Sequence, residues 1–119
     1  MKKRIVALTV AVVMLLSISA AALTNSEIIC PLLQFDGKTA HCYVEVSADH
    51  PNDPISVTAT LWRGSTPLET WTETGNGYVY LSESKVVSVT GVTYKLTADV
   101  TINGEELDQV YTTAKCPFN

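Results

Sequence analysis

VTYKLTADVT, residues 92–101, is the longest stretch in which apolar and polar residues alternate strictly. Its apolar positions are Val92, Tyr94, Leu96, Ala98 and Val100. Such alternation predicts a β-strand with one buried and one solvated face, as in an antiparallel sheet. ISVTATLW, residues 55–62, repeats the pattern and is expected to bury Ile55, Val57, Ala59 and Leu61.

Turn signals divide the rest of the chain at short intervals. Groups rich in Gly, Pro, Asn and Asp occur at 36–38, 50–54, 64–67, 75–77, 90–91 and 103–106. The fourteen Thr and ten Val that follow residue 22 are β-branched and suit strands. The predicted strands are 28–35, 40–48, 55–62, 68–74, 78–82 with 85–89, 92–101 and 107–115.

Seven or eight short antiparallel strands in about 100 residues predict a β-sandwich of immunoglobulin type. A small β-barrel is the alternative. VTGVTY, residues 89–94, adds a local signature because Gly91 stands at a turn and Tyr94 begins the next strand. This spacing predicts a tyrosine corner, in which the phenol bonds back to the backbone of the turn.

The first 22 residues have the pattern of a secretory signal peptide. Residues 2–4 are basic, residues 5–16 are apolar apart from one Thr, and Ala20 and Ala22 supply an A-x-A cleavage signal. We expect cleavage after Ala22, with cleavage after Ala21 as the alternative site, which leaves one secreted domain at 23–119. An uncleaved membrane anchor is the alternative, since the apolar run approaches the roughly 20 residues that a spanning helix needs.

The predicted mature chain is acidic. It keeps five Lys and Arg against twelve Asp and Glu, a net charge of −7. An acidic surface repels phosphates, so nucleic acid and anionic membranes are poor candidate partners.

Three cysteines allow one disulfide and leave one thiol over. Cys42 begins the second predicted strand and Cys116 ends the last, positions that meet at one end of a Greek-key sandwich. A Cys42–Cys116 bridge would close a loop of about 75 residues and contribute roughly 4 kcal/mol in the chain-entropy model. Cys30–Cys42 is the alternative, because the two cysteines face each other if the first turn centres on Asp36.

No pattern in the chain predicts catalysis or a bound cofactor. The loop SADHPNDP, residues 47–54, groups oxygen ligands that calcium accepts, but its residues are those of an ordinary turn. Glu105 and Glu106 follow a turn, and no cleft is predicted around them. We therefore expect neither an enzyme nor a metal site.

The hairpin LWRGSTPLETW, residues 61–71, holds both tryptophans. Period-two counting with a four-residue loop puts Trp62 and Trp71 on the same outward face. The sequence thus predicts an aromatic platform with a polar rim, of the kind that stacks on sugars or anchors a protein interface. Its residues are Trp62, Arg63, Glu69, Trp71 and Glu73. The alternative is that a bulge turns one Trp into the core; the binding surface would then lie in the loops at 49–54 and 75–78.

At GKTAHCYVEV, ISVTATLWRG, ETWTETGNGYVYL, VVSVTGVTYKLTADVTINGEE and TTAKC the chain resembles a recurrent group of small secreted proteins of Gram-positive bacteria. The similarity spans nearly all of the predicted mature chain. It implies a leader followed by one immunoglobulin-like sandwich of unassigned function. Proteins of this group often carry a cysteine in the second strand and one at the end, as at Cys42 and Cys116. Cys30 lies outside that pattern, so the pairing stays open.

The function expected from the sequence is that of a secreted, non-catalytic binding or surface-interaction domain. Its expected partner is an extracellular glycan, a cell-wall component, a protein or a second copy of itself. The alternative is a secreted hydrolase or thiol-redox factor that uses Cys30.

Overall fold

A computed structural model of the chain describes residues 27–118, which form an all-β domain. The predicted signal peptide at 1–22 lies outside these residues. Among those that the structure describes, no helix is long and apolar enough to cross a membrane. The strands are β1 (Ile28–Asp36), β2 (Thr39–Ser47), β3 (Pro54–Arg63), β4 (Thr66–Asn76), β5 (Tyr78–Val86), β6 (Thr93–Ile102), β7 (Glu105–Glu106) and β8 (Val110–Lys115).

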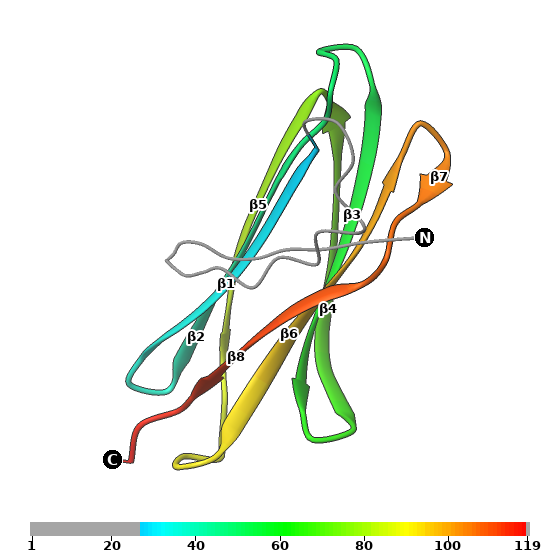
Figure 1. Cartoon of the computed structure of the whole chain (residues 1–119). Helices are drawn as coiled ribbons and strands as arrows, with labels where there is room; N and C mark the ends of the chain where they lie inside the picture. Colours follow the sequence, from blue (N-terminus) through cyan, green and yellow to red (C-terminus); the bar gives the residue numbers. More distant parts are fainter. Residues whose placement is uncertain (1–26, 119) are drawn as a thin grey trace.

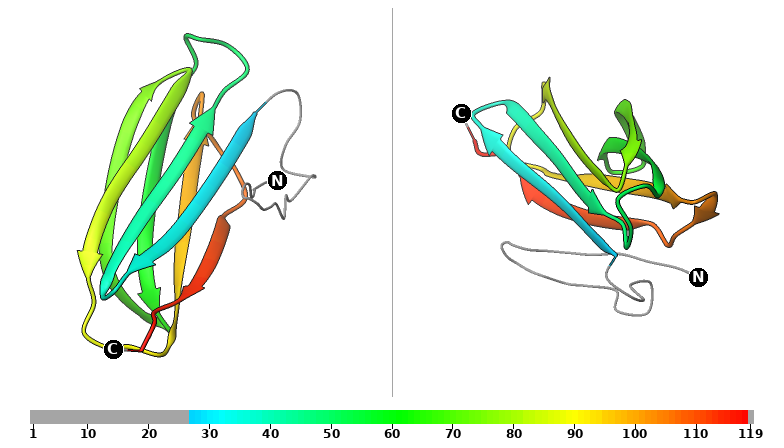
Figure 2. Two further views of the ribbon diagram at one scale, coloured as in Figure 1. Left: turned by 90° about the vertical axis from the view of Figure 1, so that its left-hand side faces the viewer. Right: turned by 90° about the horizontal axis from the view of Figure 1, so that it is seen from above.

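The strands form two antiparallel sheets packed face to face (Figure 1). One sheet has the order β1-β2-β5, and the other has the order β4-β3-β6-β7, with β8 also paired to β6. Seen from above in Figure 2, the sheets make two separate layers that do not close into a barrel. The predicted antiparallel β-sandwich is therefore confirmed, and the barrel alternative is wrong.

The core lies between the inner faces of the two sheets, where the alternation placed it. Ile55, Val57, Ala59 and Leu61 are all buried, as are the alternate residues of β6 from Tyr94 to Ile102. Thr97 departs from the pattern, because it is only 3% exposed although it points outward. The indole of Trp62 lies over it and donates a hydrogen bond from Nε1 to Thr97 Oγ1 at 2.9 Å.

Two strand bounds differ from the prediction. β5 is continuous, because Ser82–Ser84 pair with His41–Tyr43 of β2. These polar residues, which the prediction left between two strand segments, therefore belong to the same strand. The last predicted strand, 107–115, begins later than expected, at Val110 of β8, while Glu105 and Glu106 of the predicted turn form the short strand β7. Between them Leu107 donates its N–H to the Val100 carbonyl at 2.9 Å, outside the ladder of β8.

Tyr94 has the contacts expected of a tyrosine corner. Its hydroxyl donates to the carbonyl of Val89, five residues upstream, at 2.6 Å. The side chain is fully buried, and its ring lies 5.3 Å from that of Phe35 on the opposite sheet. At the turn itself, Gly91 donates its N–H to the Cys116 carbonyl at 2.9 Å. Tyr94 thus ties together β1, β6 and the turn before β6.

Candidate functional site

The two tryptophans do not form the predicted platform, because they point to opposite faces of their sheet. The hairpin has a two-residue loop, since Arg63 pairs with Thr66, and the register shifts between Leu61 and Trp62. Trp71 consequently lies across from Ala59, a residue of the inner face, and not across from Thr60 as predicted. A change of one residue in register moves a whole strand to the other face.

Each tryptophan is half-buried in a different environment. Trp71 packs against the edge of the core. Trp62 lies on the outer face, where its ring covers Thr97 as described above. Neither ring is free to serve as the flat, exposed surface that stacking on a ligand needs.

The predicted polar rim is also dispersed. Glu69 forms an ion pair with Lys85 of β5, with 3.4 Å between Oε1 and Nζ, and so joins the two sheets at one edge. Arg63 stands at the end of its hairpin, across from Tyr94 of β6. Glu73 is exposed on β4, opposite Val57. These three residues therefore surround no common site.

All three cysteines are free thiols, so neither predicted disulfide is present. The first turn centres on Gly37 and Lys38, which pairs Cys42 with Leu33 and Cys30 with Glu45. Leu33 points inward, and Cys30 is three positions away from it on the same strand. Since side chains alternate along a strand, Cys30 and Cys42 lie on opposite faces of their sheet and cannot meet.

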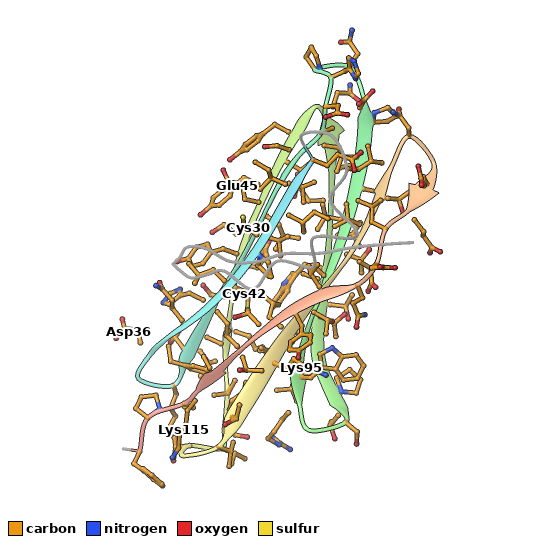
Figure 3. The ribbon with its side chains drawn as sticks, viewed as in Figure 1. Cys30, Asp36, Cys42, Glu45, Lys95 and Lys115 are labelled. Atoms are coloured by element: carbon orange, nitrogen blue, oxygen red, sulfur yellow. The ribbon has the colours of Figure 1, made fainter. Side chains whose placement is uncertain are left out.

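Cys42 and Cys116 are both fully buried, but they lie at different heights in the sandwich. The Cys116 sulfur is 3.6 Å from the carbonyl oxygen of Gly37, at the tip of the β1–β2 hairpin. Cys42 is three strand positions beyond Thr39, about 10 Å along β2 from the hairpin end. Figure 3 shows where Cys42 lies along β2. A disulfide requires Cα atoms within about 7 Å.

The surroundings of Cys30 make it a weak nucleophile. Burial, and then the charge of Glu45, raise the pKa of the Cys30 thiol to about 11. Burial, and then the charge of Glu83, raise the pKa of Cys42 to about 12. Only the thiolate form of cysteine acts as a nucleophile, and at pH 7 a thiol with the pKa of Cys30 is ionised to about one part in ten thousand.

We expect a soluble disulfide reagent to label one thiol in the folded protein and three in denaturant. The single native reaction should be that of half-buried Cys30, with a rate that rises about tenfold per pH unit between pH 7 and 10, because the thiolate fraction rises in that proportion. The Cys30→Ser variant serves as the control and should show no native reaction. Rapid labelling at pH 7, or a single thiol in denaturant, would contradict the structure.

The two loops named as the alternative surface lie together at one end of the sandwich. Gly77 donates its N–H to the Asp53 carbonyl at 2.8 Å, which holds them side by side. Hydrogen bonding, first from Asn103 and then from the His50 backbone, lowers the pKa of Asp53. Across residues 27–118, no three His, Cys, Asp or Glu side chains are arranged to hold a metal ion. An open hollow of about 430 Å³ beside these loops is lined by uncharged residues of β3, β4 and β6 and of the turn after β6.

Aromatic side chains instead gather on the outer face of the β1-β2-β5 sheet, two of them exposed and two partly buried. This face is turned to the viewer on the left of Figure 2. We call His41, Tyr43, Tyr78 and Tyr80 the aromatic stripe. His41 and Tyr43 lie on β2, and Tyr78 and Tyr80 lie on β5, the strand hydrogen-bonded to it. Tyr78 and Tyr80 are 50% and 52% exposed.

Three rings of the aromatic stripe, those of His41, Tyr43 and Tyr80, are close and nearly parallel. The ring centroids of His41 and Tyr43 are 6.5 Å apart with 16° between their planes. Those of Tyr43 and Tyr80 are 6.2 Å apart with 14° between their planes. This arrangement offers a row of aromatic rings to a ligand that lies along the strands.

Hydrogen bonds fix both ends of the aromatic stripe. Tyr78 Oη donates to Glu45 Oε2 at 2.8 Å, and His41 Nδ1 lies 3.0 Å from Ser84 Oγ. The bond to Glu45, followed by burial, raises the pKa of Tyr78. Figure 3 shows Glu45 among the side chains that project from the outer side of this sheet.

Comparison with models of known protein families found no match, and a search of curated proteins found none either. The function of the protein is therefore inferred from the arrangement of its own side chains. Within residues 27–118, the aromatic stripe brings together aromatic rings from two neighbouring strands.

The aromatic stripe was missed by the sequence analysis, although a signal for each half is present. In HCYVEV, residues 41–46, and YVYL, residues 78–81, aromatic side chains alternate with buried apolar ones. The two halves are more than thirty residues apart in the chain. Only the pairing of β2 with β5 makes them one surface.

Proposed function

We propose that this protein is a secreted, non-catalytic binding domain and that the aromatic stripe is its ligand-binding surface. The observation that carries the proposal is the row of neighbouring, half-exposed rings on a regular sheet face. A ligand that covers such rings removes apolar surface from water, which favours binding, and the tyrosine hydroxyls orient the ligand. The leader predicted at 1–22 supports export and an extracellular partner.

The alternative, a hydrolase or thiol-redox factor that uses Cys30, has less support. Cys30 lies on the same sheet face, but burial and Glu45 hold its pKa near 11. Thiol catalysts depend on the opposite shift, toward a stable thiolate.

The proposal is tested by depletion from solution. The purified protein is incubated with isolated bacterial cell walls, insoluble polysaccharides and immobilised extracellular matrix protein, and the unbound fraction is measured. We expect depletion by at least one of these materials, with no cleavage of the material, and loss of depletion in the Tyr43→Ala, Tyr80→Ala double variant.

Tyr111→Ala is the matched control, because Tyr111 is 63% exposed but lies on β8 of the other sheet. Retained depletion by the double variant would place the binding surface elsewhere. Cleavage of the material by the wild-type protein, but not by the Cys30→Ser variant, would favour the catalytic alternative.

A further inference from the structure

We infer that the ligand of the aromatic stripe is an uncharged polysaccharide, whose sugar rings lie in line over the aromatic rings. This inference rests on the proposed function and narrows it to one class of ligand. Three features of the sheet face support it.

The first feature is the mixture of aromatic and polar side chains. In each cross-strand pair along the aromatic stripe, one partner is aromatic and the other is a small or acidic hydrogen-bonding residue. The pairs are His41–Ser84, Tyr43–Ser82, Glu45–Tyr80 and Ser47–Tyr78. A sugar ring has an apolar C–H face and a rim of hydroxyls, so it needs an aromatic face and polar partners side by side.

The second feature is linearity. The four aromatic residues occupy four successive rows of the sheet, each about 7 Å from the next along the strands. Two rows are supplied by β2 and two by β5, so the rings follow one line and do not form a compact cluster. A linear array with near-parallel neighbouring rings suits an extended chain of repeating units.

The third feature is charge. Glu45 lies inside the aromatic stripe, next to Tyr80 and bonded to Tyr78. The described outward positions of β1, β2 and β5 carry no Lys or Arg. A carboxylate without a nearby cation repels anionic polymers. It also distinguishes this face from the centre of a protein interface, where charged residues are depleted.

The inference is tested by titrating the purified full chain with neutral glucan, mannan and xylan oligosaccharides from disaccharide to hexasaccharide. An oligomer of uronic acid of the same length range is the charged comparison. We expect binding to at least one neutral series, affinity that rises with chain length, and no binding to the uronic acid series. Tyr80→Ala and Tyr43→Ala should each weaken binding by about tenfold, as expected for the loss of one ring contact.

Two control variants separate stacking from other effects. Tyr80→Phe keeps the ring and should retain most of the affinity, and Tyr111→Ala should match the wild-type protein. Circular dichroism of each variant checks that it is folded.

Three outcomes would overturn the inference. Binding of cell walls or matrix protein through the aromatic stripe without binding of any neutral oligosaccharide would leave the proposed function intact but exclude this ligand class. Neutral-glycan binding that survives in the Tyr43→Ala, Tyr80→Ala double variant would place the glycan elsewhere on the molecule. Equal affinity for the uronic acid oligomer would contradict the role given to Glu45.

Discussion

Replacement of Tyr94 by alanine is expected to destabilise the domain by about 4 kcal/mol, within the range for truncating a large buried aromatic side chain. The residue is fully buried, packs on Phe35 of the opposite sheet and donates its hydroxyl to Val89. The substitution therefore removes packing between the sheets and a bond that holds the turn before β6. Urea unfolding of the variant measures the change.

Tyr94→Phe is the matched control, because it removes only the hydroxyl. It leaves the Val89 carbonyl without its donor and should cost about 1–2 kcal/mol. If both variants lost the same amount of stability, the hydrogen bond and not the packing would be responsible. A loss below about 1 kcal/mol in Tyr94→Ala would contradict the close packing seen around the ring.

Replacement of Gly77 by alanine is expected to cost about 3 kcal/mol. Gly77 has a φ of +75°, and left-handed backbone costs an alanine roughly 1–2 kcal/mol. A Cβ at this position would also lie 2.6 Å from the carbonyl oxygen of Pro51 and under 3 Å from its Cα and carbonyl carbon. Backbone cannot rotate away as a side chain can, so the loop at 49–53 must move and weaken the bonds that Gly77 makes to Asp53 and Ala48.

Gly104→Ala isolates the conformational part of this effect. Its φ is +78°, nearly that of Gly77, but a Cβ there meets no atom within 4 Å. We expect a loss of about 1 kcal/mol for Gly104→Ala. Thermal or urea unfolding of the two variants measures the difference, and equal losses would show that contact with Pro51 has no effect on stability.

The sequence by itself determined where most strands lie and, in the strictly alternating stretches, which residues are buried. In residues 55–62 and 92–101 the side-chain period of two matches the period of the strand, so Leu61 and Leu96 could be assigned to the core without knowledge of their neighbours. The spacing of Gly91 and Tyr94 likewise predicted a local contact, because its partners lie within a few residues of each other. These features depend on local geometry, which the local sequence encodes.

The tertiary structure alone decided how the strands are aligned and therefore where the candidate site lies. A hairpin loop of two residues in place of four, together with the register shift at Leu61, put Trp71 on the inner face. The strand alignment also kept Cys42 apart from Cys116 and brought Tyr43 next to Tyr80. Register between strands depends on loop length and on packing across the whole sheet, and an error of one residue reverses every side chain. The aromatic stripe joins β2 and β5, and their pairing is a property of the folded sandwich that no single stretch of the sequence contains.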